Sequence, residues 1–160
     1  MSAPATGIGW DSHRLVEGRP LILGGVRIPS ERGLAGHSDA DVLAHAVIDA
    51  LLGAAGLGDI GEHFPDTDER WAGADSLELL RAVVAMVAER ALAVVHVDAT
   101  VVIERPKLGT RKAEIRASLA AALGVGAERV NVKATTGEGM GFVGRGEGVA
   151  ALAVATLADD

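Results

Sequence analysis

The sequence contains no cysteine, and aromatic side chains make up only 2% of its residues. Without cysteine there can be no disulfide, no thiolate metal site and no cysteine nucleophile. No uncharged run approaches the roughly 20 apolar residues that a membrane helix needs, so we expect no membrane partner. The N-terminus also lacks the basic segment and apolar stretch of a secretion signal. We therefore expect a cytoplasmic protein.

A basic surface is also missing, because the formal net charge of the 160 residues is −7. Proteins that bind nucleic acids usually carry a basic face, and those that bind single strands add stacking aromatic side chains. The composition therefore argues against DNA and RNA as partners. It is compatible with a phosphorylated small molecule, because divalent cations can lie between acidic side chains and a polyanion.

Length and hydrophobic pattern predict one α/β domain over residues 1–160, large enough to bury a core. A hairpin is expected over residues 20–29, with Gly24-Gly25 as its turn. The other strands follow from alternating or continuous apolar runs. They are expected around residues 8–13, at 94–104, at 129–136 and at 149–157.

Helix boundaries are expected where capping residues precede apolar periodicity. Ser38, with Asp41 three residues on, predicts a helix start at residue 38 and an end near residue 55. A second helix follows Asp75 and reaches about residue 90. A third covers residues 110–123, because Gly124 stops it. In the strand at 94–104, the alternation places Val95, Val97, Ala99, Val101 and Ile103 on one apolar face.

Asp11-Ser12-His13 and the segment 36–45 carry the strongest chemical signal. Residues i and i+2 of a strand share a face, so Asp11 and His13 can converge on one point. With His45, they make a three-ligand zinc site whose fourth position is left for water or substrate. Taken singly, such an Asp-x-His pair usually ends in a turn, and a lone histidine on an apolar helix is usually a hydrogen-bonded core residue. Asp41, one helical turn before His45, is a candidate to orient its imidazole.

Two glycine patterns, at residues 56–61 and 139–144, fit the G-x-G-x-x-G dinucleotide fingerprint. Neither is expected between a strand and a helix, so we reject a dinucleotide fold. The segment from Thr135 to Glu138 instead opens a glycine-rich loop. Backbone amides and threonine hydroxyls there can bind phosphate oxygens, and Glu138 is a candidate ligand for Mg²⁺. An irregular surface turn is an equally good account of this loop alone.

The segment 58–68 places three aspartates near glycines. Carboxylates on such a loop can bind the hydroxyl groups of a polyol. They can equally be solvated turn-forming residues, which is the commoner role of aspartate in loops. The pattern alone leaves both roles open.

Taken together, these residues resemble one family closely, the 2-C-methyl-D-erythritol 2,4-cyclodiphosphate synthases of the non-mevalonate isoprenoid (terpenoid) pathway. The resemblance runs from Ile8 to about Leu157. Six motifs carry it, in the order of the family: the D-x-H pair, H-S-D-x-D-x-x-x-H, G-D-I-G-x-x-F-P-D-T-D, P-K-L after the central strand, V-N-V-K-A-T-T, and G-F-x-G-R-G-E-G.

The resemblance implies a fold, an assembly and a reaction. Members are α/β (α+β sandwich) subunits with a mixed four-stranded sheet and helices on one face, and they form homotrimers with active sites between subunits. Their substrate is 4-diphosphocytidyl-2-C-methyl-D-erythritol 2-phosphate, whose 2-phosphate attacks the β-phosphorus to give the cyclic diphosphate and CMP. Such a transfer depends on positioning and charge neutralisation.

The resemblance also implies roles for matching residues. Asp11, His13 and His45 match the zinc ligands, and Glu138 would hold Mg²⁺ or Mn²⁺ on the substrate diphosphate. The substrate-binding positions are His37, Ser38, Asp59, Gly61, Phe64, Asp66, Asp68, Pro106, Lys107, Leu108, Thr135 and Thr136. Within that set, His37 and Ser38 fall near the phosphates, and Pro106, Lys107 and Leu108 in the nucleotide pocket. Phe142, Arg145 and Glu147 match residues that line a central cavity of the trimer, where isoprenoid diphosphates have been proposed to bind.

Two other functions remain as alternatives. A zinc-dependent nucleotide hydrolase would use the open metal position to activate water, although no convincing general base stands beside the ligands. A non-catalytic trimer would bind isoprenoid diphosphates in its cavity, and that binding would survive the loss of zinc and of Glu138.

Overall fold

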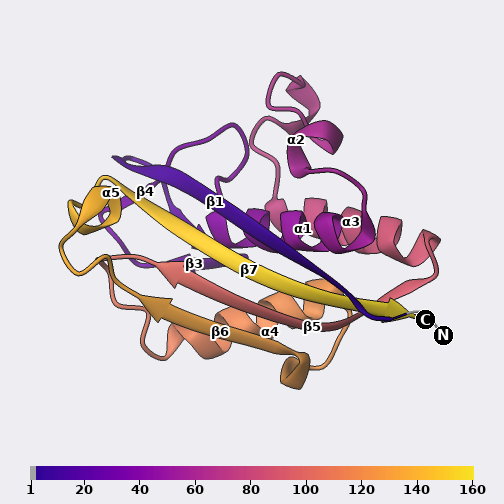
Figure 1. Ribbon diagram of the computed structural model, residues 1–160. Coiled ribbons are helices and arrows are strands. Elements are labelled where there is room, and N and C mark those ends of the chain that lie inside the picture. Colours follow the sequence, from indigo (N-terminus) through magenta and orange to yellow (C-terminus); the bar gives the residue numbers. More distant parts are fainter. Residues whose placement is uncertain (1–2) are drawn as a thin grey trace.

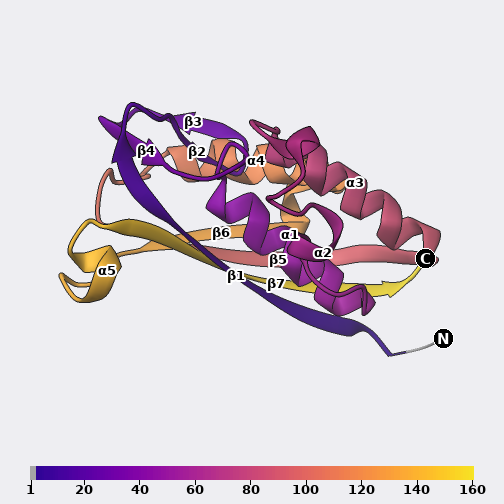
Figure 2. The same ribbon diagram turned by 90° about the horizontal axis from the view of Figure 1, so that it is seen from above.

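In this computed structural model, which describes residues 3–160, a five-stranded sheet forms one layer and helices form a second layer on one of its faces (Figures 1 and 2). Residues 1 and 2, which the predicted domain includes, lie outside the described residues. The strands of this sheet are β1 (Ala5–Glu17), β4 (Arg32–Leu34), β5 (Leu92–Val102), β6 (Val130–Thr135) and β7 (Gly148–Asp159). Their spatial order is β4-β1-β7-β5-β6, in which β5 and β6 are parallel and the other pairs are antiparallel.

Three long helices cover the sheet, and shorter elements connect them. The long ones are α1 (Val42–Ala55), α3 (Ser76–Glu89) and α4 (Arg111–Leu123). The short ones are α2 (Ile60–His63), η1 (Glu69–Trp71), η2 (Ala127–Arg129) and α5 (Gly141–Gly144), and a hairpin is formed by β2 (Leu21–Leu23) and β3 (Val26–Ile28). In the part of the chain that the structure describes, no helix is long and apolar enough to cross a membrane.

Most of the predicted elements are confirmed. The hairpin turns at Gly24-Gly25, where both residues have the positive φ that a two-residue turn requires. Helix α3 begins after its N-cap Asp75, helix α4 ends at Gly124, and β7 is a strand. The predicted four-stranded sheet is wrong, because β4 adds a fifth strand beside residues 15–17 of β1. A three-residue strand is too short to show a periodic pattern in the sequence.

Two local predictions are corrected. Helix α1 begins at Val42 rather than at residue 38, and its N-cap is Asp41, whose carboxylate accepts a hydrogen bond from the amide of Ala44. In β5, an irregularity between Val94 and His96 shifts the register against β7. Val94 is therefore buried and Val95 is exposed, the reverse of the alternation expected for that end of the strand.

Strand β1 approaches helix α1 unusually closely because its inward-facing residues are glycines. A Cβ built on Gly9 would lie 1.8 Å from the carbonyl oxygen of Ala46, and one built on Gly7 would lie 2.1 Å from that of Ala50. Only glycine fits at this distance. The same face of β1 continues to Asp11 and His13, since alternate residues of a strand share a face.

The opposite face of β1 carries large apolar side chains that none of the helices described within residues 3–160 covers. Ile8 is 68% exposed and Trp10 52% exposed. They pair across the sheet with Val154 and Leu152 of β7, so these four side chains form one apolar surface, which we call the outer sheet face. The helices lie on the other side of the sheet (Figure 2).

Candidate metal centre and adjoining cleft

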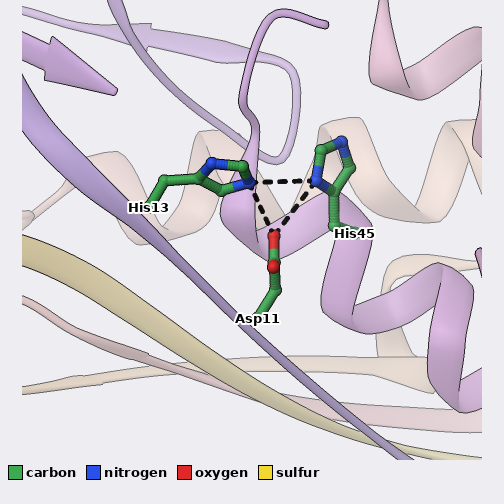
Figure 3. A group of neighbouring side chains, drawn as sticks. All are labelled: Asp11, His13 and His45. Atoms are coloured by element: carbon green, nitrogen blue, oxygen red, sulfur yellow. Dashed lines mark hydrogen bonds and ion pairs between the residues drawn. The ribbon is translucent and has the colours of Figure 1, made fainter. Parts of the chain in front are cut away.

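Asp11, His13 and His45 point toward one another from two elements (Figure 3). Asp11 and His13 come from β1 and His45 comes from α1. Asp11 Oδ2 lies 2.9 Å from His13 Nε2 and 3.0 Å from His45 Nδ1, and the two histidine nitrogens are 3.3 Å apart. The predicted convergence of these three residues is therefore present, in a group that could hold a metal ion.

The spacing of the three atoms fits a small tetrahedral cation. Ligand atoms about 2.0–2.1 Å from a zinc ion are about 3.3–3.4 Å from one another in tetrahedral geometry. The observed separations of 2.9, 3.0 and 3.3 Å fall at or a few tenths below that range. The donor set, two imidazoles and a carboxylate, is one that zinc accepts, and three protein ligands leave one position open.

The protonation of the group agrees with this geometry. Burial disfavours the charged form of Asp11, but hydrogen bonds from His13 and His45 outweigh it and lower the pKa of Asp11 to about 2. Burial lowers the pKa of His13, and its hydrogen bond and charge interaction with Asp11 reverse the direction, so that the pKa lies above its usual value. The carboxylate is thus ionised at neutral pH, as a metal ligand must be.

Hydrogen bonds on the far side of the rings direct lone pairs into the centre. His13 Nδ1 lies 2.9 Å from the carbonyl oxygen of Ala35, which can only accept, so this nitrogen carries a proton and a neutral His13 has Nε2 free to bind a metal ion. His45 Nε2 lies 2.8 Å from the hydroxyl oxygen of Ser76 and 3.3 Å from that of Ser38. No sequence pattern pointed to Ser76, which follows the N-cap Asp75 as the first residue of α3.

The predicted role of Asp41 in orienting His45 is wrong. The Asp41 carboxylate is fully buried and accepts hydrogen bonds from the amides of Gly24 at 2.8 Å, Gly25 at 2.7 Å and Ala44 at 3.0 Å. It therefore caps α1 and holds the hairpin turn, and its only hydrogen bond to His45 is between backbone atoms. An i, i+4 spacing does not bring the side chains together at an N-cap, because the cap side chain folds back to the first amides. Burial raises the pKa of Asp41 to about 6, against those amide hydrogen bonds.

The three side chains open onto a cleft of about 420 Å³. Gly36, His37 and Ser38, which precede α1, form one part of its lining. The predicted residues Gly61, Phe64 and Asp66 also line the cleft, together with Ile60, Pro65, Trp71 and Leu79. Sequence reasoning missed Trp71, which packs edge-on against Phe64 with ring centroids 5.1 Å apart. The cleft is therefore polar at the metal centre and largely apolar around Phe64.

His37 is fixed in the cleft by its neighbours. Its Nε2 donates to the carbonyl oxygen of Asp68 at 3.0 Å, and its own carbonyl accepts from the amide of Gly73. The predicted residues Asp59 and Asp68 do not line the cleft in this chain. Asp59 caps α2 through the amide of Glu62, and Asp68 caps η1 and pairs with Arg70 at 2.7 Å. A substrate role for these two aspartates stays a prediction.

The predicted nucleotide and phosphate residues lie elsewhere in the same chain. Strand β5 is followed by Pro106, Lys107 and Leu108. Strand β6 ends at Thr135, and Thr136 follows it. None of these five residues lines the 420 Å³ cleft. Strands β7 and β5 separate β6 from β1, which puts β6 about 14 Å from β1 at the usual strand spacing. Within one chain, these residues lie outside the cleft that holds Asp11, His13 and His45.

Glu138 stands on the loop after β6, exposed and with a left-handed backbone, φ 55°. The loop is anchored next to it, because the Glu104 carboxylate accepts a hydrogen bond from the amide of Gly137. Phe142, Arg145 and Glu147 gather at α5 and the start of β7, where Arg145 donates to Glu147 at 2.8–2.9 Å. Phe142 and Glu147 line a second, smaller cavity of about 230 Å³ beside His13.

Comparison with known proteins identifies the family of this chain. The sequence model of the YgbB family matches residues 5–158. The 2-C-methyl-D-erythritol 2,4-cyclodiphosphate synthase of Symbiobacterium thermophilum is 64% identical over 152 residues, 95% of this chain and 97% of that protein. The synthase of Salinibacter ruber is 64% identical over 151 residues, 94% of this chain and 96% of that protein. A solved structure of a 2-C-methyl-D-erythritol 2,4-cyclodiphosphate synthase in a CDP-bound form matches with a TM-score of 0.88 and 42% identity, over 96% of this chain and 99% of its own. The chain therefore belongs to the YgbB family, among the 2-C-methyl-D-erythritol 2,4-cyclodiphosphate synthases.

Proposed function

We propose that this chain converts 4-diphosphocytidyl-2-C-methyl-D-erythritol 2-phosphate into 2-C-methyl-D-erythritol 2,4-cyclodiphosphate and CMP, as a lyase of isoprenoid biosynthesis. The observation that carries the proposal is the 64% identity to synthases of that name over nearly their whole length. The cleft supports it, since it joins an Asp-His-His group to a wall of polar and apolar side chains.

The reaction is an intramolecular phosphoryl transfer. An oxygen of the 2-phosphate forms a bond to the β-phosphorus, the bond from that phosphorus to the bridging oxygen of the CMP group breaks, and CMP leaves with the electron pair. No water is consumed. The protein has to hold the two phosphates in line, exclude water and neutralise charge.

Asp11, His13 and His45 are the residues that would hold zinc, with one position left for a phosphate oxygen. Zinc there supplies a Lewis acid that draws negative charge from the β-phosphate. His37 and Ser38 adjoin this position in the cleft, and we assign them to the phosphates. Gly61, Phe64 and Asp66 adjoin it on the other side, and we assign them, with Asp59 and Asp68, to the methylerythritol portion.

A second group of residues would bind the nucleotide half of the substrate. We assign Pro106, Lys107 and Leu108 to the cytidine, and Thr135 and Thr136 to the phosphates. Glu138 would hold Mg²⁺ or Mn²⁺ on the substrate diphosphate, because Mg²⁺ in proteins usually binds one or two carboxylates together with phosphate oxygens. The acidic chain, with its net charge of −7, would thus accept a polyanion through cations rather than lysines.

A homotrimer with active sites between neighbouring subunits would join the two groups. The separation of β1 from β6 within one chain supports this assembly, as does the outer sheet face with Ile8 and Trp10 exposed. Apolar patches of this kind are typical of protein interfaces. In such a trimer, Phe142, Arg145 and Glu147 would face a central cavity, and Arg145 would be the contact for the diphosphate of an isoprenoid.

The reaction is tested by a ³¹P NMR time course of the zinc-loaded protein with substrate and Mg²⁺. We expect paired resonances of a cyclic diphosphate together with CMP, and their loss when zinc is chelated. CMP with an open-chain diphosphate would replace this proposal by a hydrolase. No turnover in a folded, zinc-loaded protein would leave an isoprenoid diphosphate-binding protein as the better account.

The shared site has a separate test by complementation. His45→Ala and Glu138→Ala should each be inactive, because each removes one half of every site. Unfolded together and refolded at equal amounts, they should recover about a quarter of the wild-type activity, since random assembly of a closed ring pairs an intact metal side with an intact Glu138 at that frequency. Activity that stays at the level of the separate variants would contradict a site shared between subunits.

A further inference from the structure

We infer that Asp39 and Ser76 are positioning residues that hold the His45 imidazole with its proton on Nε2, so that Nδ1 faces the metal centre as a bare lone pair. The inference rests on the proposed function only in taking His45 as a metal ligand. Ser76 is the first residue of α3, and Asp39 lies in the loop before α1. No sequence motif contains both residues.

The three side chains form a continuous hydrogen-bonded chain. The Ser76 hydroxyl donates to Asp39 Oδ1 in a short hydrogen bond, and its oxygen lies 2.8 Å from His45 Nε2. Asp39 is itself fixed, because its carboxylate also accepts from the amide of Ser76 at 2.9 Å and from that of Asp41 at 3.1 Å. Ser76 is completely buried, so no solvent competes for its hydroxyl.

The direction of each hydrogen bond follows from the chemistry of Asp39. An ionised carboxylate can only accept, so the single hydroxyl proton of Ser76 points to Asp39. The serine oxygen then has only lone pairs for His45, and Nε2 must donate to it. A neutral imidazole with its proton on Nε2 has its lone pair on Nδ1, which faces the centre 3.0 Å from Asp11 Oδ2, so a cation bound there would accept both the lone pair and the carboxylate (Figure 3).

Other neighbours of His45 do not keep its proton on Nε2. Ser38 Oγ is farther from Nε2, at 3.3 Å, and it already accepts from the amide of Ala40. The Asp41 carboxylate is saturated by three amides. Without the charge on Asp39, the Ser76 hydroxyl could turn its proton to Nε2, and His45 would then present a protonated Nδ1 to the metal.

His13 gives an internal reference, because its ring is held the other way round. Its Nδ1 donates to the carbonyl oxygen of Ala35, so its Nε2 is bare. The two ligand histidines should therefore be opposite tautomers in the same protein. Partners of this kind that orient a metal-bound histidine change metal affinity by roughly 10–100-fold when they are removed.

The test is a ¹⁵N NMR measurement of imidazole protonation, together with zinc affinity from competition with a chelator. In the zinc-loaded wild type, we expect His45 protonated at Nε2 and His13 at Nδ1. In the zinc-loaded protein, the His45 Nε2 proton should exchange slowly. Ser76→Ala and Asp39→Asn should bind zinc about 10–100-fold more weakly. In their zinc-loaded forms the His45 Nε2 proton should exchange faster with solvent, while the His13 Nδ1 proton is unchanged.

Asp75→Asn is the matched control. Asp75 caps the same helix by accepting from the amide of Leu77, and it does not contact Ser76 Oγ or His45. It should lower thermal stability without changing zinc affinity or the exchange of the His45 Nε2 proton. If it weakens zinc binding as much as Ser76→Ala does, the effect is one of helix stability and the inference is overturned.

The remaining outcomes are also decisive. A His45 Nε2 proton that exchanges rapidly with solvent in the zinc-loaded wild type would overturn the inference, and this measurement needs no variant that folds. Wild-type zinc affinity in both Ser76→Ala and Asp39→Asn would overturn it as well. Because no substrate is present, a wild type without turnover would refute the proposed reaction and leave this inference standing.

Discussion

Substitution of Gly9 by alanine should damage both the fold and the metal centre, because β1 and α1 touch at this residue. The new Cβ would lie 1.8 Å from the carbonyl oxygen of Ala46 and 2.9 Å from the amide nitrogen of Ala50. Both are backbone atoms of a buried helix, so no rotamer change relieves the clash. Strand and helix would have to separate until the closest contact reached about 3.4 Å, an ordinary van der Waals distance.

The cost follows from that displacement. Overpacking of a well-packed core typically costs about 1–3 kcal/mol, and a clash with backbone belongs at the upper end. In a domain of this size each kcal/mol lowers the melting temperature by roughly 2–4 °C, so we expect a loss of about 6–12 °C. Asp11 follows Gly9 on the same strand face and His45 adjoins Ala46 on the helix, so the same displacement separates two ligands. Metal–ligand distances tolerate only about 0.2 Å, so zinc affinity should fall at least about tenfold.

Gly53→Ala is the matched control in the same interface. Its Cβ would meet the Cα of Gly7 at 3.7 Å, an ordinary contact. Alanine near the end of α1 should therefore stabilise the protein by about 0.4–1 kcal/mol and leave zinc binding unchanged. Thermal unfolding by circular dichroism and chelator competition measure both variants. A Gly9→Ala protein that melts within about 1 °C of the wild type and binds zinc normally would refute the close-approach argument.

Four further predictions concern the loops and the titrating groups. Glu138→Gly should relieve the left-handed backbone at φ 55° and raise the free energy of unfolding by about 1 kcal/mol, while abolishing Mg²⁺-dependent turnover. Glu138→Gln should lose turnover without any gain in the free energy of unfolding. Equal free energies of unfolding for the two variants would contradict backbone strain at residue 138. Asp41→Asn should destabilise the protein by about 1–3 kcal/mol in urea titrations, because an amide group would face backbone donors, yet leave the zinc affinity of the folded protein within a few-fold. Because the pKa of Asp11 is lowered to about 2 from 3.8, its contribution to the stability of the zinc-free protein is present above the higher value and should be lost as the pH falls through the lower one. Because the pKa of His13 is raised, protons should compete with zinc at that ring, so chelator competition should show affinity falling as the pH drops through and below neutrality; an affinity independent of pH would contradict this.

The elements that the sequence predicted correctly are those whose signals are local. The hairpin depends on two adjacent glycines, and α3 depends on an aspartate N-cap before an apolar run. The start of α1 was misplaced because Ser38 and Asp41 are both good caps. Asp41 becomes the cap where the amides of Gly24 and Gly25 also bind its carboxylate, a contact between segments 16 and 17 residues apart.

In the candidate metal centre, too, the local features could be predicted and the contacts between distant segments could not. The i, i+2 spacing on a strand put Asp11 and His13 on one face, and the structure places His45 beside them. What orients His45 was not predictable, because Ser76 reaches it from a helix 31 residues farther along. A single buried serine at a helix start has no pattern of its own. Partners of a ligand that come from another element are fixed by tertiary packing, and sequence spacing alone led to the wrong aspartate.

Strand β1 shows how one segment serves both the centre and the assembly we propose. Hydrophobic side chains of a strand usually face the helices of their own domain, but here the glycines face α1 while Ile8 and Trp10 face away. Large side chains on the inner face would keep Asp11 from His45, because the strand could not approach the helix. The apolar surface that the fold needs is therefore displaced to the outer sheet face, where no helix in the described part of the chain covers it. Burial of that face by a neighbouring subunit, as in the trimer we propose, would remove these apolar side chains from water.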